Sequence, residues 1–230
     1  MFEMVKAVAA DAWRVLTFRA SREQLLALDT RHLLFGFVCT WLVGMGRYWD
    51  DPRAHLAQRL GVGSLVYVVL LALGLYLVML PLSPSDWSFK RLLTFITLVS
   101  PPAALYAIPV ERFFSNELAR SMNAWFLATV ALWRVTLLFH YLARLARFRW
   151  YEILIAGLLP LTAIVTALFL LNLEHVTFDL MGGIRDSSGN DRAYAILFWL
   201  TLLSTQLFLP LFIAYLALAI VKRIKRRSRS

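Results

Sequence analysis

Few polar residues of this chain have the type and position to do chemistry, and most of these lie inside apolar stretches. Arg134 is the charge placed deepest in such a stretch, and an ionisable group surrounded by hydrocarbon marks a candidate site because its burial is costly. Asn123 lies 11 positions before it and Tyr141 lies 7 positions after it. At 100° per residue the three side chains share one helical stripe, which we expect to contact a ligand.

Ser100, Pro101 and Pro102 lie in the middle of another apolar run. Two adjacent prolines remove two backbone donors, which predicts free carbonyl groups near 96–98 that can receive the Arg134 guanidinium. Counted at 1.5 Å per residue, Arg134 lies about 22 Å and Gln206 about 18 Å from the outer ends of their runs, so the two side chains can meet. The predicted ligand site comprises Arg134, Gln206, Asn123, Tyr141, Ser100, Pro101 and Pro102.

The charge of this predicted site is positive, because no Asp or Glu lies deep in any of the apolar runs to offset Arg134. The site therefore favours an anionic ligand. Two structural roles for Arg134 remain open: its long stem can carry the charge to the inner interface, or it can pair with Glu152. Pro160 and Pro210 lie at a similar depth and predict further helix kinks, although prolines are common in membrane helices generally.

Signatures of catalysis and metal binding are absent from the sequence. There is no HExxH pattern, and His32, His55, His140 and His175 lack a Cys or His partner at ligand spacing. No glycine-rich loop that could cradle a phosphate is present. We therefore predict no catalytic residue, no metal site and no cofactor.

The elements that position these residues are six long apolar runs. Hydrophobic residues make up 60% of the 230 residues and charged residues 17%, whereas a soluble domain usually has about 25% charged residues. A helix needs about 20 apolar residues to cross a bilayer. This pattern predicts an all-α, polytopic membrane bundle, with spans at 32–49, 62–82, 91–110, 119–142, 151–173 and 194–221. The first run is short and contains Gly36, Gly44 and Gly46, so we also consider that it is re-entrant.

Lys and Arg residues concentrate on the side of both termini in this layout, which predicts cytoplasmic ends. Short loops and the lack of a removable leader suit a bacterial inner membrane. The formal charge of +10 is explained by the membrane better than by nucleic acid, because a basic cluster directly follows the last run. We expect this cluster to contact anionic lipid headgroups: Lys222, Arg223, Lys225, Arg226 and Arg227.

Three regions are predicted along the chain: 1–30, 31–221 and the basic tail 222–230. Residues 4–28 are expected to form one amphipathic interfacial helix, or alternatively a soluble helix that caps the bundle; its apolar face comprises Val5, Ala9, Ala12, Trp13 and Leu16. Gly36, Thr40 and Gly44 recur every four residues and predict a close helix-packing seam, within one subunit or in a homo-oligomer. Asp51 and Pro52 predict the start of a short helix through Leu60, and residues 182–192 predict a loop.

These features favour a permease- or channel-like membrane subunit that handles an anionic or amphipathic small molecule or a lipid. The alternative is a noncatalytic membrane scaffold that binds lipids and a partner membrane or cytoplasmic subunit. A second alternative is an intramembrane lipid-modifying enzyme that uses polar groups of the outer loops, such as Glu111 and His175.

Overall fold

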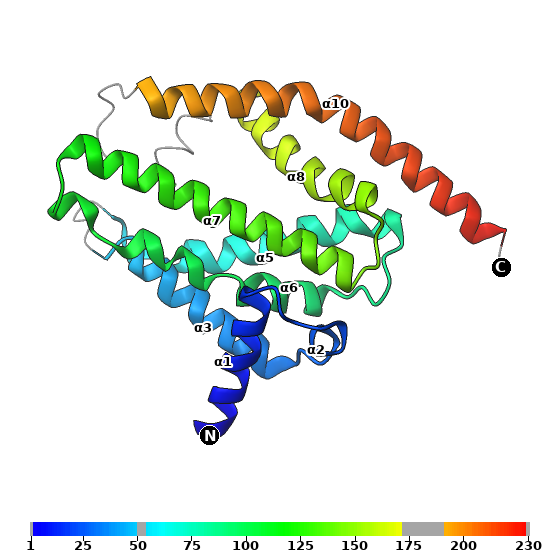
Figure 1. The fold of residues 1–230 in the computed structure, drawn as a ribbon, viewed down its shortest axis with the longest axis horizontal. Helices are drawn as coiled ribbons and strands as arrows, with labels where there is room; N and C mark the ends of the chain where they lie inside the picture. Colours follow the sequence, from blue (N-terminus) through cyan, green and yellow to red (C-terminus); the bar gives the residue numbers. More distant parts are fainter. Residues whose placement is uncertain (1, 50–53, 172–190, 229–230) are drawn as a thin grey trace. The chain divides into compact units, whose positions relative to one another are not determined.

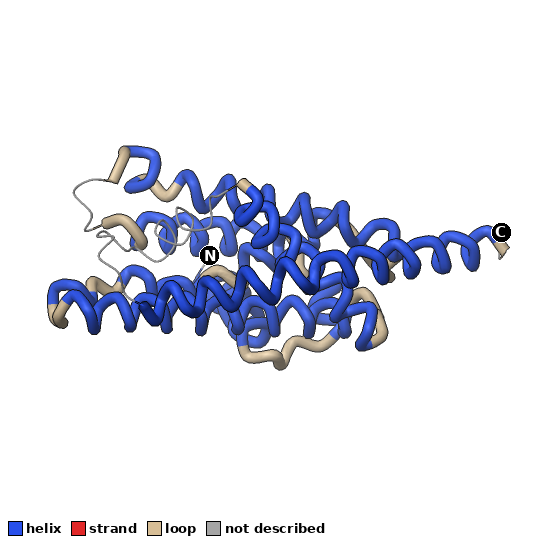
Figure 2. Tube along the Cα trace, turned by 90° about the horizontal axis from the view of Figure 1, so that it is seen from above, coloured by secondary structure: helices blue, strands red, loops and turns tan. Residues whose placement is uncertain are grey.

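The structure is a computed structural model that describes residues 2–49, 54–171 and 191–228. It is 82% helical, and the described residues contain no strand (Figure 2). The all-α expectation is therefore confirmed. The helices divide into two compact units, residues 1–109 with 132–148 and residues 110–131 with 149–230.

The first unit contains most of the short elements (Figure 1). Its elements are α1 (Phe2–Leu16), α2 (Arg22–Leu26), α3 (Thr30–Gly46), α4 (Leu56–Arg59), α5 (Val62–Met79), η1 (Leu80–Leu82), α6 (Phe89–Leu98) and η2 (Pro101–Ala107). The C-terminal part of α7 (Asn116–Arg144) completes it. Within this unit α3 packs against both α5 and α6.

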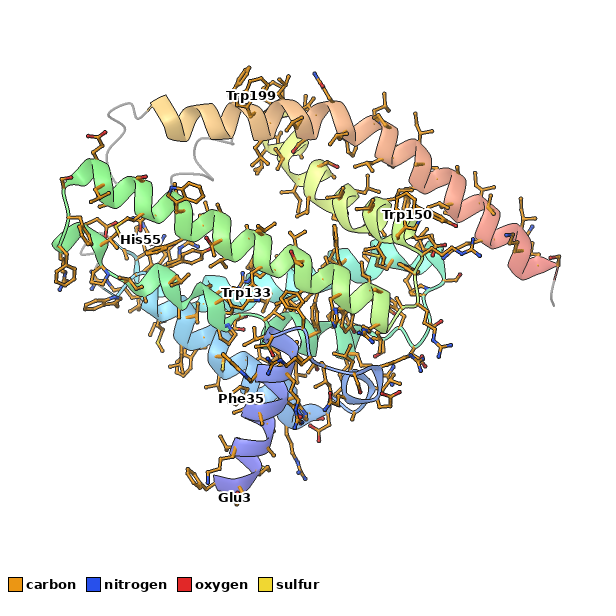
Figure 3. The ribbon with its side chains drawn as sticks, in the orientation of Figure 1. Glu3, Phe35, His55, Trp133, Trp150 and Trp199 are labelled. Atoms are coloured by element: carbon orange, nitrogen blue, oxygen red, sulfur yellow. The ribbon has the colours of Figure 1, made fainter. Side chains whose placement is uncertain are left out.

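The second unit contains η3 (Val110–Arg112), the N-terminal part of α7, α8 (Trp150–Leu170) and α10 (Asp191–Arg227). Helix α10 lies along α8 (Figure 1). Trp150 at the start of α8 and Trp199 in the first half of α10 are largely exposed side chains (Figure 3). Rings at such positions suit a membrane–water interface, where one edge of the indole contacts water.

Within the described residues, four segments are long and apolar enough to cross a membrane: Val62–Leu82, Glu117–Arg144, Trp150–Leu170 and Phe198–Lys225. A fifth would be the pair Phe89–Leu98 and Pro101–Arg112, which is bent by 41° at the break between its parts. Helix α3 has 17 residues, a rise of about 25 Å at 1.5 Å per residue. The chain is thus a membrane protein by the length and composition of its helices, and the count of six spans stays a prediction.

The N-terminal prediction of one helix over 4–28 is wrong, because α1 ends at Leu16 and a turn separates it from α2. Phe18 has a φ of 62°, which is incompatible with a continuing α-helix. Ser21 then starts α2 with a capping box, in which Gln24 is the partner. Two residues of the predicted apolar face, Ala12 and Leu16, are buried together with Val8 and Val15, whereas Val5 and Trp13 are exposed.

The packing of α3 on α6 forms the centre of the first unit. The buried residues of α3 are Gly36, Thr40 and Gly44, which lie on one stripe. A Cβ atom added to Gly36 would lie 2.3 Å from the Thr97 hydroxyl oxygen, so this position has no room for a side chain. The same test places a Gly44 Cβ 2.6 Å from the hydroxyl oxygen of Ser64 in α5. These two glycines allow α3 to approach α6 and α5 closely.

Two loop predictions fall partly outside the described residues. Asp51 and Pro52 lie in the gap at 50–53, and the helix that follows begins only at Leu56, with His55 as its N-cap residue. Most of the predicted loop 182–192 lies in the gap at 172–190, and α10 begins at Asp191. At its other end α10 continues through the basic cluster to Arg227, so the predicted tail is largely an extension of the last helix.

Candidate functional site

The site is built on a break in the chain after α6. Pro101 and Pro102 have no N–H to continue the i→i+4 hydrogen bonds of α6, so the α-helix stops at Leu98 and a 3₁₀ turn begins at Pro101. In that turn the Ala103 N–H donates to the Ser100 carbonyl at 3.0 Å. Pro102, which follows Val99 by three residues, has no N–H. The Val99 carbonyl is therefore left without a local backbone donor.

Arg134 of α7 supplies the missing donors. Its Nε donates to the Val99 carbonyl at 3.2 Å, and its Nη2 donates to the Ser100 carbonyl at 3.4 Å. The sequence predicted that the guanidinium would bind carbonyls near 96–98, and this detail is wrong. The acceptors lie one to two residues later, because the chain changes from i→i+4 to i→i+3 hydrogen bonds and so exposes a different carbonyl.

The charge of Arg134 has no carboxylate partner among the described residues. The side chains that act on it electrostatically are the phenols of Tyr106 in η2 and Tyr67 in α5. Arg47 also contacts Tyr106, with its guanidinium carbon 5.8 Å from the ring centroid. Tyr106 thus lies beside Arg47 and acts electrostatically on Arg134, and the sequence analysis missed it. The available signal was its position four residues after the double proline.

A group of buried hydroxyls lies directly beneath the break: Thr40, Thr94, Thr97 and Ser100, each at most 3% exposed. The Thr40 and Ser100 hydroxyl oxygens are 2.8 Å apart, and the Thr40 hydroxyl also donates to the Gly36 carbonyl at 2.8 Å. The Thr97 hydroxyl donates to the Thr94 carbonyl at 2.9 Å. Because every one of these groups has a partner, the layer joins α3 to α6 and fixes the geometry that Arg134 binds.

The residues of the predicted stripe on α7 each have their own partner in the structure. Asn123 donates from Nδ2 to a Glu111 side-chain oxygen at 2.6 Å, and both residues belong to the second unit. Tyr141 is seven residues past Arg134, about 10 Å along the helix. Its ring stacks on Phe95 with the centroids 4.1 Å apart. The three residues share a face of α7, but each contacts a different partner.

Gln206 lies on α10 in the second unit and is exposed. Its meeting with Arg134 in the first unit stays a prediction. Pro160 and Pro210 lie inside α8 and α10, and both helices continue through them. Of these three proline positions, only the double proline interrupts its helix, because a single missing donor can be tolerated where two adjacent ones cannot; the kinks at Pro160 and Pro210 stay a prediction.

Glu152, a sequence-based alternative partner for Arg134, is engaged within the second unit. Its Oε1 forms an ion pair with Lys222 Nζ at 2.8 Å, and its Oε2 accepts from the Arg149 backbone N–H at 2.9 Å. Lys222, expected to contact lipid headgroups, therefore joins α10 to the start of α8. Arg223, Lys225 and Arg227 of the same basic cluster are exposed.

The polar groups expected to support lipid chemistry at the outer loops are only partly described. Glu174 and His175 lie in the gap at 172–190, and Glu111 is bonded to Asn123. No group of three or more His, Cys, Asp or Glu residues that could hold a metal occurs in the part of the chain that the structure describes. Comparison with protein-family models, curated proteins and solved structures finds no match to this chain.

Proposed function

We propose that this chain is a permease- or channel-like membrane subunit that binds an anionic or amphipathic small molecule or a lipid at Arg134. The observation that carries the proposal is that the Arg134 charge has no carboxylate partner among the described residues. Its two hydrogen bonds go to neutral carbonyls. Burial of a cation without a compensating anion is costly. An anionic ligand that contacts the remaining guanidinium N–H groups would offset that cost.

The break that holds Arg134 supports this proposal. Membrane transporters place substrates at interrupted helices near mid-depth, where backbone polar groups are released from the helix. Here the interruption carries a fixed guanidinium together with the phenols of Tyr106 and Tyr67. A site with a cation and two phenols suits an oxyanion on a partly apolar molecule. Ser100, Pro101 and Pro102 belong to this site as the residues that create it.

The membrane arrangement that goes with this function has six spans, with α3 as the first and the α6–η2 pair as the third. Both termini face the cytoplasm of a bacterial inner membrane, which places Arg223, Lys225 and Arg227 against anionic headgroups. Helix α1 lies at the membrane surface. Its exposed apolar residues Phe2, Val5 and Trp13 support this placement, as does Lys6, which lies 4.3 Å from the Phe2 ring centroid.

The test compares Arg134→Gln with Arg144→Gln, a matched change of an exposed arginine at the end of the same helix. Both variants and the unchanged protein are reconstituted into liposomes, and the fluxes of inorganic phosphate, citrate and taurocholate are measured. We expect flux of at least one anion, reduced at least tenfold by Arg134→Gln and unchanged by Arg144→Gln. Equal behaviour of the unchanged protein and Arg134→Gln with all three anions would reject the proposal.

The noncatalytic scaffold is the second candidate, and the same hydrogen bonds favour it. If Arg134 serves only to bind the carbonyls of Val99 and Ser100, its removal should destabilise the first unit and have no specific effect on ligands. Arg134→Gln would then fail to accumulate as folded protein. Purification of the unchanged chain with a stoichiometric partner subunit would also support this candidate.

A further inference from the structure

The N-terminus of α6 carries an unusual set of charges. Helix N-termini favour acidic residues and bound anions, because their free N–H groups point outward. The first turn of α6 has no acidic residue and contains Lys90 and Arg91 instead. Ser88 caps the helix and satisfies one donor, the Arg91 N–H, at 3.3 Å. Two cations at the positive end of a helix dipole are unfavourable unless an anion lies near them.

A second guanidinium lies beside this helix end. Arg22 of α2 forms an ion pair with the Asp86 carboxylate, while Arg91 donates from Nη1 to the Asp86 backbone carbonyl at 2.6 Å. The Asp86 carboxylate therefore compensates one of the two arginines. The Nε atom of Arg22 is buried and has no hydrogen-bond partner. Both guanidinium groups retain donors that these contacts do not use.

Tyr141 provides an independent sign that a ligand group is missing here. The residue is 1% exposed, and its hydroxyl has no hydrogen-bond partner. Its ring stacks on Phe95 at 4.1 Å and lies 6.3 Å from Trp87, measured between centroids. Phe95 lies one helical turn after Arg91 on α6, and Trp87 lies in the segment just before the helix, so the Tyr141 ring packs on the face of α6 that carries Arg91. Arg91 is also the charge that acts on the Tyr141 hydroxyl.

These observations share one chemical requirement, which is an acceptor with negative charge. A trapped water could accept from the Tyr141 hydroxyl, but it would leave the charge of the two arginines and of the helix end uncompensated. A phosphate group has several acceptor oxygens and a charge that suits paired guanidinium groups. Trp87 beside the same position suits the interface where lipid headgroups lie.

We propose that the phosphate of an anionic lipid headgroup binds at the N-terminus of α6, between Arg91, Arg22 and the Tyr141 hydroxyl. This site is separate from the Arg134 site, since Tyr141 lies two turns further along α7 and none of the three residues contacts the double-proline break. The proposal stands whether or not the chain transports an anion.

The main test uses Tyr141→Phe, which removes only the hydroxyl. Full-length protein in a neutral detergent is heated with added dioleoylphosphatidylglycerol, dioleoylphosphatidylcholine or inorganic phosphate, and the unfolding temperature is followed. Without additive we expect the variant to be at least as heat-stable as the unchanged protein, because a buried unsatisfied hydroxyl is lost. With phosphatidylglycerol added, the unchanged protein should have the higher unfolding temperature of the two. Apparent affinity for that lipid should fall about tenfold, the loss of one charge-assisted hydrogen bond.

Tyr76→Phe is the matched control, because Tyr76 stacks on Trp87 in the same aromatic group at 6.3 Å between centroids. It should keep the full response to phosphatidylglycerol. Neither protein should respond to phosphatidylcholine, whose phosphate is neutralised by choline. An equal response to inorganic phosphate alone would identify the ligand as the free ion and overturn the assignment to a lipid.

Two further outcomes decide the proposal. Arg91→Gln should lose the same response, and combining it with Tyr141→Phe should add little, because both act on one bound phosphate. If Arg91→Gln does not fold, the reversal seen with Tyr141→Phe still decides. Equal gains from phosphatidylglycerol in Tyr141→Phe and in the unchanged protein would overturn the proposal. The absence of any gain in the unchanged protein would overturn it as well.

Discussion

Helices α6 and α10 are both apolar, but they differ in what surrounds them. Every residue of α6 from Leu92 to Leu98 is buried by protein. In α10 the one buried residue in the described part is Ser204, and large apolar side chains such as Leu209 and Ile213 are exposed. Helix α6 is thus held by other helices of its unit, whereas most of the α10 surface suits lipid. Apolar composition alone indicates a span, and it does not separate these two environments.

The largest expected difference is between leucines in the two helices. Leu98→Ala in α6 removes a side chain that is 1% exposed and should lower the free energy of unfolding by about 3 kcal/mol, through lost contacts and a cavity. Leu209→Ala in α10, where the side chain is 60% exposed, should cost less than about 0.5 kcal/mol. Titration with sodium dodecyl sulfate in mixed micelles measures both. Equal losses would show that α10 is packed against another protein surface.

The next effect concerns the close approach that buries α6. Gly36→Ala places a methyl group against the Thr97 side chain and the Leu98 backbone nitrogen, and should destabilise the protein by about 2 kcal/mol. Gly74→Ala in α5 is the control, because a Cβ there has no atom within 4 Å. It should be neutral or slightly stabilising. A harmless Gly36→Ala, measured in the same titration, would mean that α3 can move away from α6 without cost.

Hydroxyl groups give a third and smaller expected difference between the surroundings of α6 and of α10. Thr40→Val removes the hydroxyl that joins α3 to Ser100 and should cost about 1 kcal/mol. Thr205→Val in α10 removes a hydroxyl that donates to the Thr201 carbonyl of its own helix at 2.8 Å, and that carbonyl keeps its helical hydrogen bond. Its effect should be near zero. Thermal unfolding of the two variants in one detergent checks this, and a larger loss for Thr205→Val would contradict it.

The smallest effect lies at the start of α3, outside the spans. The Asp29 carboxylate is hydrogen-bonded by the His32 side chain and by the backbone N–H groups of His32 and Arg31, which lowers its pKa below the usual value. A carboxyl group whose pKa is lower in the folded state stabilises the fold at pH values above its ordinary pKa. This stabilisation is lost as pH falls through the folded-state pKa. Asp29→Asn should reduce stability by about 0.5 kcal/mol at pH 7.

In Asp29→Asn, stability should decrease less steeply as pH falls below about 4, the region where a free Asp titrates. Unfolding temperatures measured from pH 7 to pH 3 would show the two curves converging at the acidic end. Parallel curves would mean that the Asp29 charge does not contribute. Lys225→Gln, which changes an exposed side chain of α10, is the control and should leave the acid part of the curve unchanged.

How far prediction succeeded depended on the kind of feature. The run 62–82 corresponds to α5 with η1, and the run 151–173 to Trp150–Leu170. The break at Pro101 and Pro102 was also located from the residues alone. The N-terminal helix was not, since a capping Ser21 and a positive φ at Phe18 end α1 in a stretch whose apolar spacing continues. Local turn chemistry therefore overrode periodicity at that point.

Side-chain partners were the least predictable feature. Arg134, Asn123 and Tyr141 share a face of α7, yet their partners are the Val99 carbonyl, the Glu111 carboxylate and the Phe95 ring. Glu152 could have met Arg134 by depth alone, and Lys222 is its partner instead. Depth and angle restrict a side chain to a level and a face. They do not say which neighbouring helix lies there.

The sequence by itself determined that this chain is helical and belongs in a membrane, because long apolar runs in lipid must satisfy their backbone groups within each segment. It also determined where one helix must break, because proline has no N–H to donate. Only the tertiary structure decided which carbonyl Arg134 binds, which helix is enclosed and which is exposed, and that Tyr141 belongs to a different cluster from Arg134. These outcomes depend on contacts between residues far apart in the chain, and hydropathy carries no information about such contacts.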